Sequence, residues 1–139
     1  MSVSISDLPG FERVGVICGE DAQLLPIGTF PRTAAVYAFA VKGDVRYIGA
    51  AERLARRMIG YRNHQIKNTS QRRVHQDMRK ALAGGDVEIF ALVIAPRPVS
   101  YGGLWIDPLI GVEAGLIMKF KPEWNRRGTA LAVETPISE

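Results

Sequence analysis

Hydrophobic residues form five short alternating or continuous runs along this chain and recur at helical spacing in three longer stretches. Alternating apolar residues predict strands, because successive side chains on a strand point to opposite faces, whereas spacing of three and four residues predicts helices. We expect an irregular segment at 1–10, a proline- and glycine-rich loop at 96–104 and a loose tail at 128–139. The predicted strands are 12–17, 22–26, 36–41, 45–48 and 86–95, and the predicted helices are 51–64, 70–83 and 106–120.

The third and fourth strands form a predicted hairpin that carries Tyr37 and Tyr47. A two-residue Gly43–Asp44 turn would put the two phenols on opposite faces of the sheet. A three-residue Lys42–Asp44 loop would put them on one face, because directly opposed residues share a face. A site that uses both phenols needs them on one face, so we predict the three-residue loop or a bulge with the same effect.

The helix predicted at 51–64 combines an apolar stripe with a neighbouring stripe of basic and aromatic residues. Arg57 and Tyr61 are four residues apart, which places them one turn apart on the rim that faces the tyrosines. Phenols beside guanidinium groups suit a phosphodiester, which needs hydrogen-bond donors, a proton acceptor and positive charge. His64 lies a further turn along and is given a minor role. The predicted core stripe is Ala51, Leu54, Ala55 and Met58.

The last predicted helix carries a single charge between Pro108 and Met118, which is Glu113. A carboxylate on so apolar a helix is costly unless it is paired or bound to a metal. From the residues alone, an ion pair with Arg57 and a metal-ligand role both remain open.

Composition and charge point to one domain with a nucleic-acid partner. The chain has 139 residues and a formal net charge of +4, and residues 53–80 hold nine of its 18 lysines and arginines against the single acid Asp77. So one-sided a distribution favours phosphate contact over a merely solvated surface. The predicted nucleic-acid contacts are Arg53, Arg56, Arg62, His64, Lys67, Arg72 and Arg73.

The remaining composition narrows the protein class. Cys18 is the only cysteine, so a disulfide framework and a CxxC metal motif are excluded. The first ten residues lack the pattern of a signal peptide, and no uncharged apolar run approaches the ~20 residues that span a bilayer. We therefore expect a cytoplasmic protein.

Several motifs occur in the order found in the GIY-YIG nucleases, and residues 35–126 resemble that family. Tyr37 matches the tyrosine of the first half-motif, where Ala35-Val36 replace the usual Gly-Ile, and Tyr47-Ile48-Gly49 is a complete second half. Arg57 follows that glycine by eight residues, as in the family. The family's block of glutamate, Leu-Ile, proline and aromatic-Asn is matched by Glu113, Leu116-Ile117, Pro122 and Trp124-Asn125.

The resemblance implies an α/β (α+β) fold with a small central antiparallel sheet flanked by helices. It also divides the chain into an N-terminal extension at 1–34 with room for an additional hairpin, a nuclease-like domain at 35–127 and a tail at 128–139. The implied activity is that of an endonuclease that hydrolyses DNA phosphodiester bonds and leaves 5′-phosphate and 3′-hydroxyl ends.

The resemblance also assigns roles. The catalytic residues would be Tyr37, Tyr47, Arg57, Tyr61 and Glu113, supported by Gly49 and Asn125. Glu113 would bind one Mg²⁺ or Mn²⁺ ion, since clustered carboxylates for two metals are lacking. Tyr37 would take or relay the proton of the attacking water.

Two alternatives accompany this interpretation. One is a non-catalytic nucleic-acid-binding module of the same fold, and the other is a basic protein-interaction domain. The chain has no room for a separate DNA-reading module, so we expect specificity to come from 1–34, the 96–104 loop, a homodimer or a partner protein. RNA remains open as a substrate.

Overall fold

The computed structural model describes residues 3–20, 23–62, 69–95 and 97–126. Within these ranges the chain forms seven strands, three α-helices and two short 3-10 helices. No helix of the described residues is long and apolar enough to cross a membrane. The elements are η1 (Ile5–Asp7), β1 (Glu12–Glu20), β2 (Gln23–Gly28), β3 (Ala35–Val41), β4 (Asp44–Ala51), α1 (Leu54–Arg62), α2 (Thr69–Leu82), β5 (Val87–Val93), β6 (Val99–Tyr101), β7 (Leu104–Ile106), α3 (Pro108–Phe120) and η2 (Glu123–Arg126).

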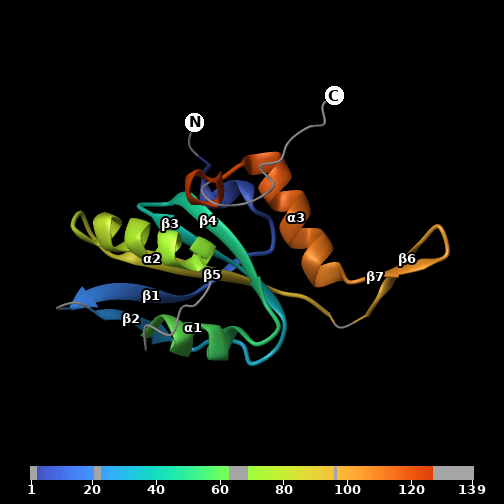
Figure 1. Ribbon diagram of the computed structural model, residues 1–139, viewed down its shortest axis with the longest axis horizontal. Helices are drawn as coiled ribbons and strands as arrows, with labels where there is room; N and C mark the ends of the chain where they lie inside the picture. The colour runs from blue at the N-terminus through green and yellow to red at the C-terminus, as the bar shows by residue number, and fades with distance from the viewer. Residues whose placement is uncertain (1–2, 21–22, 63–68, 96, 127–139) are drawn as a thin grey trace.

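The centre of the molecule is a five-stranded sheet in the order β2-β1-β5-β3-β4, and every neighbouring pair is antiparallel (Figure 1). The α+β fold with an antiparallel sheet flanked by helices is confirmed. The hairpin expected before residue 35 is β1–β2, and it joins this same sheet through β5. The division of the chain into extension, domain and tail stays a prediction.

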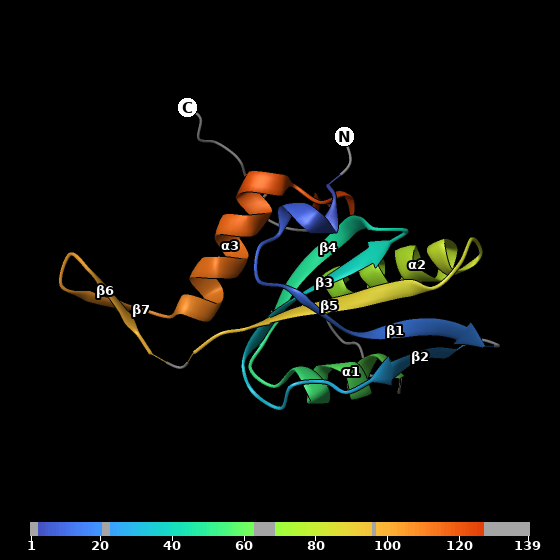
Figure 2. The same cartoon turned by 180° about the vertical axis from the view of Figure 1, so that it is seen from behind.

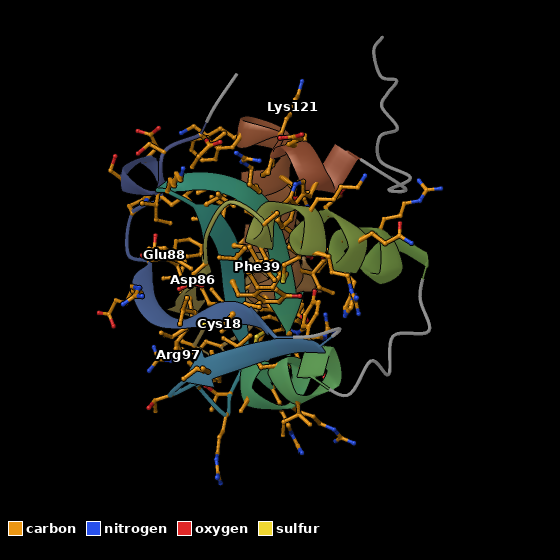
Figure 3. The ribbon with its side chains drawn as sticks, turned by 90° about the vertical axis from the view of Figure 1, so that its left-hand side faces the viewer. Cys18, Phe39, Asp86, Glu88, Arg97 and Lys121 are labelled. Atoms are coloured by element: carbon orange, nitrogen blue, oxygen red, sulfur yellow. The ribbon has the colours of Figure 1, made fainter. Side chains whose placement is uncertain are left out.

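Helices cover both faces of the sheet, as Figures 1 and 2 show from opposite sides. On one face, α1 and α2 pack over alternate residues of β3 such as Tyr37 and Phe39, and Phe39 lies at the centre of the molecule in Figure 3. On the other face, α3 and the segment around η1 pack over Val36 and Ala38. Since β3 is buried on both faces, its run of Ala, Val, Tyr and Phe is almost continuously apolar.

The β3–β4 hairpin reaches the predicted geometry through a bulge. The turn has two residues, Lys42 and Gly43, both at positive φ (53° and 81°), and it pairs Val41 with Asp44. Two positive φ values are typical of the type I′ turn, which matches the twist of the strands. The register then shifts between Phe39 and Ala40, which makes residue 46 the additional residue of β4. The prediction of a three-residue loop is wrong. The alternative prediction, a bulge that puts Tyr37 and Tyr47 on one face, is confirmed.

The predicted loop at 96–104 is wrong, because residues 99–106 form the β6–β7 hairpin. Three residues on each side alternate about Gly102-Gly103, which have φ of 58° and 81° and supply a tight turn. Nearby prolines and glycines masked this short alternation in the sequence. The last helix consequently starts at Pro108 rather than at 106, with Asp107 as its N-cap accepting a hydrogen bond from the Leu109 N–H.

Candidate active site

Tyr37 lies at the centre of a cluster formed by β3, β4 and α1. Its side chain is fully buried, and its hydroxyl accepts a hydrogen bond of 3.2 Å from Nη1 of Arg57. The bulge in β4 brings the Tyr47 ring to the same face, 6.1 Å from the Tyr37 ring between centroids. The structure thus brings together three groups that are 10 and 20 residues apart in the sequence.

Gly49 permits this arrangement because it pairs with Tyr37 across the hairpin. A Cβ atom added to Gly49 would lie 2.7 Å from Cζ and Oη of Tyr37 and 2.8 Å from Cε2 of Tyr47. Contacts this short do not occur between real side chains, so any larger residue would displace a phenol. The glycine of the YIG motif has a steric reason in this chain.

Tyr61 lies deeper than the rim position expected from helical spacing. Only 2% of it is exposed, and its ring contacts the edge of the Phe39 ring. Its hydroxyl is buried beside the Tyr37 side chain, which helps to raise its pKa, but it forms no well-aligned hydrogen bond in the described part of the chain. A buried hydroxyl without a partner is costly, so this one is a candidate to bind a substrate oxygen or a water.

Burial keeps the Tyr47 and Tyr61 hydroxyls neutral. Burial, followed by the neighbouring Tyr37, raises the pKa of Tyr47 and of Tyr61 well above the ordinary value of a phenol, while Arg57 opposes this shift. Burial also disfavours the charge of Arg57, but the surrounding phenols outweigh it and raise the pKa of the guanidinium. At neutral pH, Tyr47 and Tyr61 therefore hold their protons and act as donors, and Arg57 stays charged.

Two side chains occupy the free edge of β4, which is the outer strand of the sheet. Asn125 in η2 accepts a hydrogen bond from the Ile48 N–H and donates one to the Ile48 C=O, each of 2.8 Å. Glu113 in α3 lies beside the backbone of Ala50, two residues further along, which lowers the pKa of its carboxyl. This edge therefore connects α3, which packs on the opposite face, to the cluster of phenols.

The Glu113 carboxylate is half-buried and lies within the electrostatic influence of Arg57. Burial raises its pKa, and Arg57 and the backbone of Ala50 counteract part of that increase. None of the ion pairs among the described residues joins Glu113 to Arg57. The alternative that a salt bridge alone accounts for this acid is therefore not supported by the geometry.

The donor set fits a single hard cation. The described residues contain no group of three or more His, Cys, Asp or Glu side chains that could hold a metal. Mg²⁺ needs less, because it is commonly bound by one or two carboxylates together with waters and phosphate oxygens. Glu113 could supply the single protein carboxylate of such a site.

The predicted nucleic-acid contacts are only partly located. Arg53 and Arg56 at the start of α1 and Arg73 in α2 are exposed. Arg62 and Arg72 belong to α1 and α2, but their side chains are not described. His64 and Lys67 lie outside the described residues.

Two buried polar residues of α2 escaped the sequence analysis. His75 is 8% exposed, and its ring stacks on Tyr61 at 6.5 Å between centroids. Asp77 is 6% exposed. The available signal was spacing, because these residues lie next to the buried apolar positions Val74 and Met78, whereas Arg73, Gln76, Arg79 and Lys80 face solvent.

Comparisons with known proteins identify the fold. No family model and no curated protein matches the sequence. A mutant of bacteriophage T4 EndoII superposes with a TM-score of 0.69 at 19% identity, covering 87% of this chain and 96% of that one. The restriction endonuclease HPY188I, solved in complex with product DNA, gives 0.55 at 14% identity, covering 96% of this chain and 87% of that one. The chain has a GIY-YIG nuclease-like fold.

Proposed function

We propose that this protein is a divalent-metal-dependent endonuclease that hydrolyses DNA phosphodiester bonds. The observation that carries the proposal is the meeting of Tyr37, Tyr47, Tyr61 and Arg57 beside Glu113, a half-buried carboxylate that forms no ion pair within the described part of the chain. The shared fold with a restriction endonuclease bound to product DNA supports DNA as the substrate class.

Each side chain has a role that follows from its surroundings. Arg57, held against Tyr37, would neutralise charge that develops on the phosphoryl oxygens. Tyr47 and Tyr61 stay protonated and would donate hydrogen bonds to phosphate or water. Tyr37 would receive or relay the proton of the attacking water while Arg57 stabilises the resulting negative charge.

Glu113 would hold one Mg²⁺ or Mn²⁺ ion. Such an ion supplies a Lewis acid that polarises the scissile phosphate and stabilises the leaving 3′ oxygen. Glu113 lies in α3 beside the backbone of Ala50 at the edge of β4, where its carboxylate would be available to such an ion. The products would carry 5′-phosphate and 3′-hydroxyl ends.

The decisive test compares wild type with Glu113→Gln on supercoiled plasmid and on a labelled single strand, with Mg²⁺ and with EDTA. We expect cleavage only by wild type with the metal, a loss of at least ~100-fold in Glu113→Gln, and retained DNA binding. The raised pKa of Glu113 means that its carboxylate takes up a proton at a higher pH than an ordinary carboxylate does. As the pH is lowered, cleavage should therefore be lost earlier than it would be with an ordinary carboxylate.

Lys119→Ala is a matched control, because it alters an exposed charge on the same helix away from the cluster. DNA binding by wild type without cleavage under any divalent ion would replace the nuclease with a non-catalytic nucleic-acid-binding module. Cleavage by Glu113→Gln at the wild-type rate would refute the metal-ligand role.

A further inference from the structure

The β6–β7 hairpin forms an arm that stands away from the sheet and helices in both views (Figures 1 and 2). Residues 98–106 include no charged side chain. Tyr101 and Trp105 are each 75% exposed and Leu104 is 68% exposed. Isolated two-stranded hairpins are marginally stable in water, so an apolar arm of this kind needs a covering surface.

The register of the arm gives it one wholly apolar face. Val99 lies opposite Ile106, and Tyr101 lies opposite Leu104, so these four side chains share a face. Trp105 points to the other face and lines a groove of about 400 Å³ where the arm meets the start of α3, and the acids Glu52 and Asp107 also line this groove. Both faces of the arm therefore present hydrophobic surface.

Helix α3 continues this surface. Ile110 and Met118 are 61% and 71% exposed, and exposed Ala114 lies between them at a spacing of four residues. This outer stripe faces away from the sheet, whereas Leu109 and Leu116 on the other side of the helix pack against the sheet. Of the ten exposed large hydrophobic residues in the described chain, seven lie on the arm and the stripe: Val99, Tyr101, Leu104, Trp105, Ile106, Ile110 and Met118.

The area of this surface is adequate for a stable interface. An aromatic side chain buries ~150–250 Å², and with somewhat less for each aliphatic one the seven residues offer on the order of 800 Å², which is the contribution of each partner to a standard interface. Monomeric proteins rarely expose a continuous apolar patch larger than ~600 Å².

The distribution of charge favours a second copy of the chain over nucleic acid as the partner of this surface. Nucleic acid is bound by lysine and arginine, and none of these lies in residues 98–106 or on the stripe. The exposed arginines of the described chain are at the start of α1 and in α2, with others at Arg13, Arg32 and Arg97, the last of which directly precedes the arm. Copies of a chain with a net charge of +4 repel one another, so they would approach most easily through a face without charge. An arm beside a bare helix stripe is also self-complementary about a twofold axis.

We propose that the protein is a homodimer in which the arm of each chain packs across the α3 stripe and groove of the other. A consequence, which rests on the proposed function, is that one particle carries two Glu113 sites and cuts both strands of a duplex. The dimer itself does not depend on catalysis.

The test measures mass by light scattering after gel filtration at increasing protein concentration, without DNA or metal. We expect wild type at twice the chain mass of 15.3 kDa and Tyr101→Lys/Leu104→Lys at the single mass, with at least a tenfold weaker association. Ile27→Lys/Ile59→Lys is the matched control, because both residues are 56% exposed elsewhere on the molecule, and it should remain dimeric. Met118→Lys tests the stripe independently if the arm variant does not fold.

Wild type at the single mass at every concentration would overturn the proposal, as would arm and stripe variants that dimerise like wild type. A monomeric wild type whose arm variant has altered DNA affinity would assign the arm to nucleic acid instead. On supercoiled plasmid, wild type should linearise and the arm variant should only nick. If neither protein cuts, the nuclease proposal fails, while the mass measurement still decides the dimer.

Discussion

At the scale of single residues, the candidate site depends on a close approach that only glycine allows. Tyr37 and Tyr47 both pass over Gly49, and the Tyr37 hydroxyl is there held by Arg57. The positions of the two phenols, and of the arginine bound to one of them, therefore depend on the absence of a side chain at residue 49. A single added methyl group tests this.

We predict that Gly49→Ala displaces Tyr37 or Tyr47 and lowers the free energy of unfolding by ~1–3 kcal/mol, as overpacking of a rigid core does. Displacement of Tyr37 by ~1 Å would also lower the cleavage rate by about 100-fold. Denaturant unfolding and cleavage assays measure the two effects.

The control for this change is Gly60→Ala in α1, where an added Cβ meets nothing within 4 Å. Alanine is favoured over glycine in a helix by ~0.5–1 kcal/mol, so this variant should be slightly more stable and equally active. A Gly49→Ala protein as stable and active as wild type would show that the tyrosines do not need their present positions.

At the scale of elements, the backbone of residues 3–5 pairs with the start of the edge strand β4, and a side chain takes the place of a neighbouring strand further along it. Asn125 pairs with both backbone groups of Ile48, which lies between Tyr47 and Gly49. An unpaired edge invites association with other chains, and a side-chain amide is one means of blocking it. The same clamp fixes the part of β4 that carries the site.

Asn125→Ala should lower the free energy of unfolding by ~2–4 kcal/mol, because it leaves one N–H and one C=O of Ile48 buried without partners. Equilibrium unfolding gives this loss, and hydrogen exchange at the Ile48 amide should become faster than in wild type. Glu123→Ala, which removes only an exposed ion pair 3.6 Å long with Arg46, should change stability by less than ~0.5 kcal/mol. Equal effects of the two substitutions would argue against the clamp.

The sequence predicted elements more readily than their exact register. The continuous apolar run of β3 and helical spacing in α1 and α2 located these elements within a few residues, and motif order indicated which side chains belong together. The type I′ turn with its bulge could not be distinguished from a longer loop, because both put Tyr37 and Tyr47 on one face. The burial of Tyr61 and His75 depends on packing between α1 and α2, which no local pattern encodes.

The arm was missed for a related reason. Three-residue strands carry little periodic signal, and Pro98 and the two turn glycines are typical of loops. Exposure of Tyr101 and Leu104 is a tertiary fact, since an apolar run in a sequence normally indicates core. An apolar run on an exposed hairpin indicates a surface that binds a partner instead.

At the scale of the whole molecule, charge and hydrophobic surface are segregated. The helices α1 and α2, on one face of the sheet, carry the exposed Arg56, Arg73 and Arg79, whereas the arm and the α3 stripe of Ile110, Ala114 and Met118 are uncharged. Nucleic acid and a second copy would then use different faces. A dimer formed through the neutral face would leave both basic faces open.

This segregation predicts how binding depends on salt. Each phosphate neutralised by a side chain contributes ~0.9 to the slope of log affinity against log salt concentration on duplex DNA. Arg56→Ala should therefore lower the slope by about 1 and weaken binding to all sequences alike. Lys119→Ala removes an equal charge from the last turn of α3, on the opposite face of the sheet, and should leave the slope unchanged. Fluorescence anisotropy titrations over a series of salt concentrations measure both slopes, and an equal decrease in the two variants would mean that DNA does not select the face formed by α1 and α2.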